Sequence, residues 1–155
     1  MSFVKEKGVN RMGLYRYSVS LRLRHPNIDP AEISRTLGMQ SNGSWRAGEQ
    51  RRTPKGNPLN GVRSETYWYA DIVEGESITK RLVSALHEAL DKLELHESFL
   101  KRIRDEGGRA EFFVGWYIKS QAGEDFDQSL LSRLTKLQID LALDNYHDPD
   151  LPDEE

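Results

Sequence analysis

The side chains best suited to metal or acid–base chemistry are the four histidines, one of which stands in a regular spacing with carboxylates. His87, Asp91 and Glu94 follow an i, i+4, i+7 pattern in a stretch with helical periodicity, so they share one helix face. Such a set can ligate a metal ion, but the same spacing is typical of a charged, solvated helix face. We prefer the second interpretation because His87 lies beside a leucine stripe, and we assign no metal site.

Sequence signatures of nucleophiles and cofactors are missing. The chain has no cysteine, which excludes disulfides, thiolate chemistry and cysteine-based zinc sites. It contains no nucleophile elbow, no P-loop and no dinucleotide-binding glycine motif. Carboxylate pairs of the glycosidase type meet only in space and are not visible in a sequence. We therefore name no catalytic residue and no cofactor, and the sequence leans away from an enzyme without deciding the question.

Basic and aromatic residues form a stronger pattern. Arginines occupy the polar positions of an alternating segment at 15–24, and tyrosines occupy one side of a second segment at 64–73. On the open side of a sheet they would either offer a surface on which single-stranded bases stack, or simply pair with one another across strands. The residues that can share this face are Arg22, Arg24, Tyr67 and Tyr69, with Phe113 or Tyr117 from a third strand.

Residues 40–63 form a long basic segment without periodicity, rich in glycine and proline, with Glu49 as its only carboxylate. Loops of this length are often functional or disordered, although a part near Trp45 can pair as an irregular strand. Trp45 is a candidate anchor for a protein partner, but we prefer that it folds over the sheet edge as part of the core. The candidate binding residues of this loop are Trp45, Arg46, Arg51, Arg52 and Lys55.

Periodicity outlines the elements that must position these residues. Asp29 and Pro30 predict the start of a short helix that ends at Gly38. A longer helix is expected to be capped by Ser77 and to run from Ile78 along a leucine stripe. Alternation predicts strands at 15–24, 64–73 and 109–120.

The end of the domain is predicted by similar signals. The long helix is expected to break near Leu95 and to stop at the glycine pair 107–108. Asp127 is a suitable cap for a last helix with a core stripe of leucines. Residues 139–146 fit either a continued helix or a strand, and we prefer the strand.

Together these elements predict one α+β domain at 14–147. We expect a two-layer sandwich: a mixed, mostly antiparallel sheet of about four to five strands with helices on one face, ferredoxin-like in outline. Residues 1–13 are expected to be a flexible leader and 148–155 an acidic, disordered tail.

Composition and charge narrow the class of protein further. The chain has 155 residues, 37% hydrophobic and 30% charged, and no apolar run long enough for a membrane span, so we expect a cytoplasmic protein without a membrane partner. The net charge of −3 is unevenly distributed. Residues 1–63 carry 12 Lys/Arg against 4 Asp/Glu, whereas 64–155 carry 10 against 21. The two halves either form a dipolar molecule or interleave so that the charges mix.

Several segments resemble one family across nearly the whole folded chain, about residues 15–147. They read YSVSLRLRH, DPAEISRTLGM, SWRAGE, SETYW and LQIDLALDNY. In these the chain is similar to the bacterial family called domain of unknown function 4279 (DUF4279). The resemblance implies a fold and favours a strand at 139–146, but it carries no catalytic residue. Some small bacterial families of this kind are suggested to act as immunity proteins against secreted toxins.

Three functional hypotheses follow. The first is a small cytoplasmic interaction module that binds a protein partner and could neutralise it, as an immunity protein does. The second is a single-stranded nucleic-acid-binding domain that uses the arginines and tyrosines of the sheet. The third is an enzyme with a carboxylate or histidine site that the sequence does not reveal. The sequence makes no prediction of the oligomeric state.

Overall fold

The computed structural model describes residues 13–153. The predicted leader therefore lies outside the described residues except for its last position, Gly13. Along the chain, the elements are β1 (Tyr15–His25), α2 (Pro30–Leu37), β2 (Gly43–Trp45), β3 (Gln50–Arg52), β4 (Pro58–Val62), β5 (Thr66–Glu76), α3 (Leu82–Leu93), the 3-10 turn η1 (Glu94–His96), α4 (Glu97–Asp105), β6 (Arg109–Ile118), α5 (Gln128–Leu137) and β7 (Ile139–His147).

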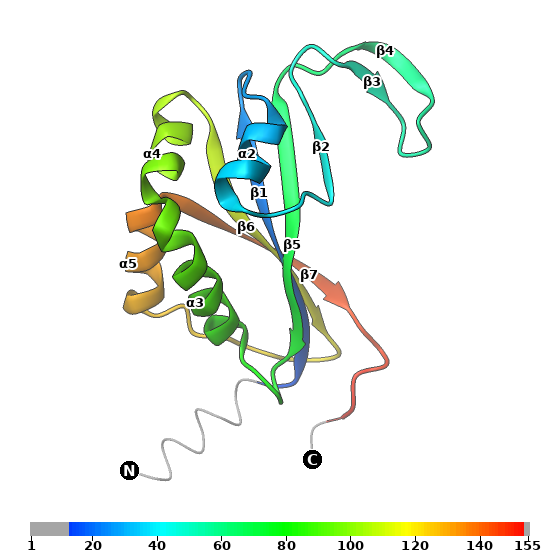
Figure 1. The fold of residues 1–155 in the computed structure, drawn as a ribbon. Coiled ribbons are helices and arrows are strands. Elements are labelled where there is room, and N and C mark those ends of the chain that lie inside the picture. The colour runs from blue at the N-terminus through cyan, green and yellow to red at the C-terminus, as the bar shows by residue number, and fades with distance from the viewer. Residues whose placement is uncertain (1–12, 154–155) are drawn as a thin grey trace.

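Five strands form one mixed sheet in the order β2-β5-β1-β6-β7. β1 is antiparallel to both neighbours, β5 and β6, while β6 and β7 are parallel. Because α3 and α4 connect β5 to β6 with β1 inserted between them, this part is a split β-α-β unit, as in ferredoxin-like folds. The helices lie on one side of the sheet and leave the other side open (Figure 1). The α+β prediction is confirmed.

β1 is the central strand, and the alternate residues that were predicted to be apolar and buried are buried. Tyr17, Val19 and Leu21 are at most 2% exposed, and they face the leucines of the helices. Each apolar side chain of this size that is fully buried contributes about 1.5–3 kcal/mol relative to an exposed one. The core therefore fixes which side of β1 is left open, and with it the direction of the strand's arginines.

The short helix α2 has the predicted ends. The Asp29 carboxylate accepts a hydrogen bond from the amide of Ala31 at 2.9 Å, and Gly38 closes the helix at φ +64°. A hydrogen bond at 3.0 Å from Trp68 Nε1 to Ser34 Oγ joins the helix to β5. The helix is thereby fixed over the end of the sheet from which β2 and the following hairpin leave.

The prediction that Ser77 caps the long helix is wrong. The Ser77 hydroxyl instead accepts a hydrogen bond from the Tyr15 amide at 3.0 Å, which extends the sheet, and Ile78 is 65% exposed. The helix α3 begins four residues later, at Leu82, whose amide donates to the Tyr15 hydroxyl at 3.0 Å. A distant tyrosine thus serves as the cap. The predicted break near Leu95 is confirmed by η1.

Segment 40–63 contains more regular structure than its sequence predicts. Gly43–Trp45 pairs with β5 as the sequence suggested, but β3 and β4 also pair and form a separate two-stranded sheet. This hairpin projects from the body of the domain beside β2 (Figure 1). All residues of β3 and β4 are exposed, so no side of the hairpin shows the hydrophobic alternation that a half-buried strand requires.

The first residues of the expected acidic tail, 148–155, pack against the domain. Asp148 and Leu151 are buried, and the Asp148 carboxylate accepts a hydrogen bond from Arg16 on β1. Disorder of the remaining acidic residues stays a prediction. Within residues 13–153, no helix combines the length and apolar character that crossing a bilayer requires.

Candidate functional site

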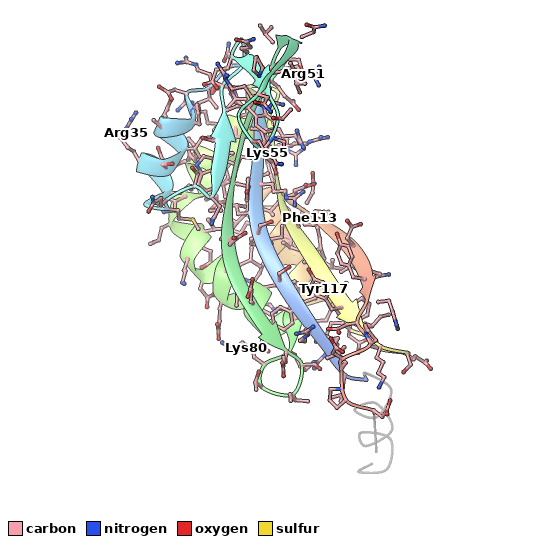
Figure 2. All side chains as sticks on the ribbon, turned by 90° about the vertical axis from the view of Figure 1, so that its right-hand side faces the viewer. Arg35, Arg51, Lys55, Lys80, Phe113 and Tyr117 are labelled. Carbon is pink, nitrogen blue, oxygen red and sulfur yellow. The ribbon has the colours of Figure 1, made fainter. Side chains whose placement is uncertain are left out.

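The open side of the sheet brings together residues from segments far apart in the sequence. The strand register places Tyr69 beside Arg22 and Tyr67 beside Arg24, and Trp45 of β2 lies on the other side of Tyr67. Figure 2 views this side, with Phe113 and Tyr117 on β6 and the hairpin residues Arg51 and Lys55 at one end. We call one part of it the arginine–aromatic face, which consists of Arg22, Arg24, Trp45, Tyr67, Tyr69, Phe113 and Arg63.

The aromatic residues of this face form a continuous row across β2 and β5. The ring centroids of Trp45 and Tyr67 are 4.8 Å apart, and those of Tyr67 and Tyr69 are 5.8 Å apart. Glycine at position 43 leaves room for the Tyr69 ring, since a Cβ there would lie 2.6 Å from a ring carbon. Trp45 packs against Tyr67 at the edge of the sheet but is only half-buried and lies outside the hydrophobic core, so the preferred prediction that it is part of the core is wrong. Tyr67 is almost fully buried.

Each arginine of the face lies over an aromatic ring. The guanidinium carbon of Arg22 is 3.5 Å from the centroid of Phe113, and that of Arg63 is 3.8 Å from the centroid of Trp45. Arg24 lies 4.6 Å from the centroid of Tyr67. These cation–π contacts hold the guanidinium groups in place while their N–H groups remain able to bind an acceptor.

This arrangement bears on the two sequence interpretations of the face. A base that stacks needs an accessible ring surface, whereas Phe113 is covered by Arg22, and Trp45 has Arg63 and Tyr67 against it. The cross-strand pairing foreseen as the alternative is the arrangement that the structure contains. What the face offers to a ligand is therefore guanidinium N–H groups more than ring surfaces.

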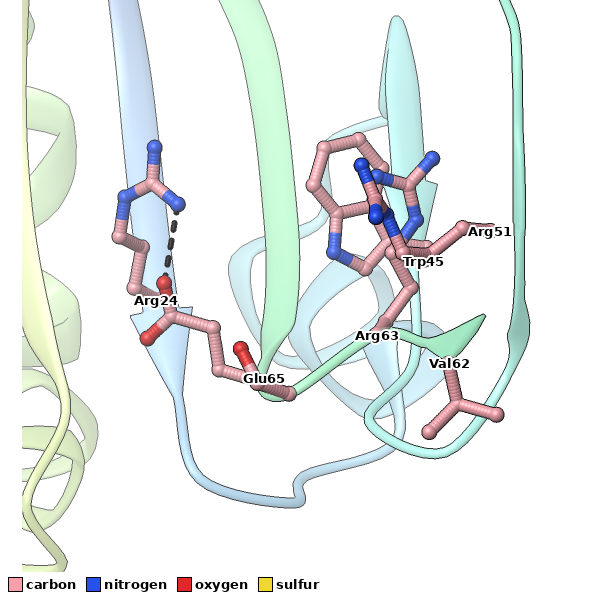
Figure 3. A pocket seen from close by; sticks show the side chains of 7 residues that line it. Arg24, Trp45, Arg51, Val62, Arg63 and Glu65 are labelled. Atoms are coloured by element: carbon pink, nitrogen blue, oxygen red, sulfur yellow. Dashed lines mark hydrogen bonds and ion pairs between the residues drawn. The ribbon is translucent and has the colours of Figure 1, made fainter. Parts of the chain in front are cut away.

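A cavity of about 340 Å³ lies where the hairpin leaves the sheet. Arg24 and Glu65 form an ion pair at 3.0 Å on one side of it, and Arg63 lies over Trp45 on the other (Figure 3). We call it the hairpin pocket. It is lined by Arg24, Trp45, Arg51, Val62, Arg63, Ser64 and Glu65.

The basic residues of segment 40–63 separate into two groups. Arg46 lies 3.6 Å from Asp29, the cap of α2, and so joins an ion pair next to the helix. Among residues 13–153, no ion pair is formed by the other four basic residues of the hairpin region, which bind only main-chain oxygens or extend from its surface. These four are Arg51, Arg52, Lys55 and Arg63.

Tyr67 stays uncharged among these cations. Burial raises the pKa of its hydroxyl, against the opposite effect of Arg22 and Arg24 nearby. The tyrosine is therefore protonated at neutral pH and contributes a neutral ring beneath the guanidinium groups. The positive charge of the face is not compensated from within the row of aromatic residues.

The histidine and the two carboxylates that share one face of α3 and η1 bind an arginine of another helix. Arg133 on α5 lies 2.9 Å from Nδ1 of His87 and donates hydrogen bonds to Asp91 at 2.6 Å and Glu94 at 2.8 Å. The three side chains thus hold a guanidinium and fasten α5 to α3. In the part of the chain that the structure covers, no cluster of three or more histidine or acidic side chains is arranged to hold a metal ion.

His25 also has a structural role. Its Nδ1 accepts hydrogen bonds from the amides of Asn27 and Ile28 at 3.0 and 2.9 Å, so the ring closes the turn after β1. Because Nδ1 is used as an acceptor, the proton of the neutral ring is on Nε2, which lies 3.5 Å from a Glu106 oxygen. The histidine is buried and away from the open side of the sheet.

Sequence reasoning missed three contributors to the open side. Arg63 lies in the aperiodic segment, where no pattern shows that it meets Trp45, and Glu65 lies within the predicted strand at 64–73 but before the start of β5, where it pairs with Arg24. Tyr146 on β7 stacks on Tyr117 at 5.1 Å. This residue was within reach of prediction, because alternation along a strand at 139–146 places it on the polar side.

Comparisons with known proteins give a family and no activity. A family model described as a domain of unknown function (DUF4279) matches residues 15–148, from the start of β1 to just past β7. No curated protein and no solved structure matches the chain.

Proposed function

The chain belongs to the DUF4279 family, and we propose that it is a binding module that holds an acidic surface of a protein partner against its arginine–aromatic face. The observation that carries this proposal is the set of three arginines, Arg22, Arg24 and Arg63, each held on an aromatic ring. Arginine and aromatic residues are favoured at the centres of protein interfaces, because they combine large contact area with several hydrogen-bond donors.

Charge complementarity supports an acidic partner. Of these arginines only Arg24 has an ion-pair partner within residues 13–153, Glu65. The hairpin beside the face adds Arg51, Arg52 and Lys55. Opposite potentials on two proteins accelerate their encounter and fix their orientation, and mismatched charges exclude wrong partners.

Two observations favour a protein over single-stranded nucleic acid. Three of the rings that would stack with bases, those of Phe113, Tyr67 and Trp45, have an arginine of the chain itself over them. In addition, the exposed Asp144 occupies an outward position of β7, at the opposite edge of the same open side, where it would repel a phosphate backbone that crossed the sheet. A protein surface can instead match an open side that is basic toward β2 and the hairpin and acidic toward β7.

The expected mode of action is occupation of the partner's surface, as for an inhibitory or immunity-type protein. We also propose a cytoplasmic location, because a chain without cysteine suits a reducing compartment. Neither proposal requires a cofactor.

The experiment is affinity capture on the immobilised protein from nuclease-treated lysate, followed by titration calorimetry with the purified partner. We expect an Arg22→Glu/Arg63→Glu variant to lose binding, because two cations of the face become anions. Arg35→Glu, on an exposed position of α2, is the matched control and should bind as the wild type does. Binding should also weaken with added salt.

Two results would contradict the proposal. One is a partner that binds the face variant and the wild type equally well. The other is that no protein is captured from the nuclease-treated lysate while a single-stranded oligonucleotide binds in a salt-sensitive way, which would favour the nucleic-acid hypothesis.

A further inference from the structure

We infer that the hairpin pocket is a receptor for one carboxylate of an acidic side chain of the partner, gripped between Arg51 and Arg63. The inference rests on the proposed function and makes it specific: it names the group that is bound and the place where it is bound. The pocket lies between the hairpin and the sheet, so one acidic side chain of the partner would join the two.

The charges of the pocket leave two guanidinium groups for a ligand. Three arginines and one carboxylate line it, and Glu65 is already paired with Arg24 at 3.0 Å. Arg51 and Arg63 form no ion pair within residues 13–153. A carboxylate has two oxygens that accept hydrogen bonds in one plane, which suits two guanidinium groups on either side of it.

Both arginines are held before a ligand arrives. Arg63 lies 3.8 Å from the centroid of Trp45 and donates to the Arg52 carbonyl at 3.2 Å, while Arg51 donates to the Asn60 carbonyl at 3.4 Å. A guanidinium has five N–H donors, so most of them remain for a ligand. Because these side chains are already positioned, binding costs less side-chain entropy than it would with free arginines.

The walls of the pocket fit the apolar part of an acidic side chain. Val62, which is 60% exposed, provides a methyl surface, and Trp45 adds the part of its ring that Arg63 and Tyr67 leave uncovered. These can cover the methylene groups of a glutamate while its carboxylate reaches the arginines. A volume of about 340 Å³ is at the lower end of the range for ligand sites and is large enough to admit a single side chain.

A fluorine NMR titration tests the pocket directly. Protein labelled with 5-fluorotryptophan has three resonances, one for each tryptophan, and Trp45→Phe identifies the one from the pocket. We expect a short peptide with two glutamates to move the Trp45 resonance in a saturable way and to leave that of the fully buried Trp68 in place. Arg51→Gln should weaken this binding about tenfold, the usual effect of one charged hydrogen bond.

Two controls separate binding of a carboxylate from a general effect of the peptide or of a lost charge. The matched peptide with glutamines should cause no saturable shift, and Arg35→Gln should bind the glutamate peptide as the wild type does. The inference is overturned if the glutamate peptide causes no saturable shift, if the glutamine peptide binds equally well, or if only a phosphoserine peptide binds. Unchanged affinity in both Arg51→Gln and Arg63→Gln would overturn it as well.

Failure of the pocket can be distinguished from failure of the proposed function. If the partner needs Arg22 but the peptide titration shows no site at Trp45, the pocket inference is wrong and the binding face stands. If the peptide binds at Trp45 but the partner is captured equally well by every variant of the face, the proposed function is wrong. The carboxylate that the pocket binds then does not belong to this partner.

Discussion

At the scale of single residues, buried polar groups connect the elements that carry the binding face. The Thr66 hydroxyl is fully buried, donates to the Ile28 carbonyl at 2.7 Å and accepts from the Ala47 amide at 3.1 Å. It therefore links the turn after β1 to the end of β2. Trp68, one residue on from Tyr67, is also fully buried and donates its indole N–H to Ser34. These bonds hold α2 and β2 against β5.

The bond between Trp68 and Ser34 allows a prediction about stability. Ser34→Ala should lower the free energy of unfolding by about 1–2 kcal/mol, because the buried indole N–H loses its acceptor while alanine gains slightly in helix propensity. Urea unfolding followed by circular dichroism measures the difference. Ser132→Ala, an exposed serine on α5, is the control for propensity alone. Equal stability of the two variants would show that the indole bond contributes nothing.

At the scale of elements, the connection from α4 to β6 depends on a close approach of two backbones. A Cβ at position 108 would lie 2.5 Å from the Arg24 carbonyl oxygen and 2.9 Å from that of Ile103. Main-chain atoms in a central strand and a packed helix cannot move aside independently. Glycine at this position is therefore required for the end of α4 to approach the end of β1, the central strand that carries Arg24.

A matched pair of glycine substitutions tests this connection. We expect Gly108→Ala to lower the free energy of unfolding by about 1–3 kcal/mol, as overpacking against fixed atoms does. Gly115→Ala should cost less, because its nearest neighbour is the Ser18 hydroxyl, at the end of a side chain that can rotate. Thermal and urea unfolding of both variants gives the comparison. A larger loss for Gly115→Ala would contradict this role of Gly108.

The β3–β4 hairpin is a second element whose role can be separated from folding. The Gly48 amide donates to the Arg63 carbonyl at 2.8 Å, and the Arg63 amide donates to the Glu49 carbonyl at 2.7 Å, so the chain enters and leaves the hairpin at one point. Its strands are exposed and add nothing to the core. A short turn between Glu49 and Arg63 can therefore close the chain without it.

Replacement of residues 50–62 by Asn-Gly should separate stability from binding. We expect the free energy of unfolding to change by no more than about 1 kcal/mol, because surface loops tolerate such changes. Binding of the glutamate peptide should be lost, since Arg51 and Val62 are removed from the pocket. Urea unfolding and the fluorine titration measure the two effects. Retained peptide binding would show that the hairpin has no part in the site.

At the scale of the whole molecule, the basic and acidic halves of the sequence interleave in part. Arg16 on β1 pairs with Asp148 after β7, and Arg102 on α4 pairs with Glu32 on α2. The hairpin is different: Arg51, Arg52, Lys55 and Arg63 form no ion pair within residues 13–153. Charge is thus neutralised across the body of the domain and left uncompensated where we propose that the partner binds.

The pair of Arg16 and Asp148 predicts how stability depends on pH. The hydrogen bond from Arg16 holds the pKa of the Asp148 carboxyl below its ordinary value of about 3.9. A group whose folded pKa is lowered stabilises the fold above its unfolded pKa, and this contribution disappears as the pH falls through the folded value. Arg16→Gln should therefore be less stable than the wild type at pH 7 and pH 5.

The difference between the two proteins should begin to shrink below about pH 4, where the carboxyl is protonated in the unfolded chain, and should disappear only below the lowered pKa of folded Asp148. Urea unfolding at pH 7, 5 and 3 measures it, with Arg35→Gln as an exposed control. A difference that stays constant over this range would mean that Arg16 acts through packing and not through the charge of Asp148.

The sequence by itself determined those features that depend on neighbours in the chain. Alternation along β1 fixed which side chains are buried, and Asp29, Gly38 and Asp127 marked helix ends that the structure reproduces. The preference for a strand over 139–146 is likewise confirmed by β7. Such signals are local because a strand or a helix repeats its buried side every two or about four residues.

Only the tertiary structure decided the features that depend on distant contacts. The start of α3 is fixed by Tyr15, and Ser77 pairs with that same residue, which lies 62 positions earlier in the chain. The hairpin was invisible because neither of its sides is buried, so its sequence has no hydrophobic period. For the same reason no pattern could show that Arg63 lies over Trp45, since two half-buried side chains meet there where the hairpin closes on Gly48 and Glu49, and no hydrophobic period brings them together.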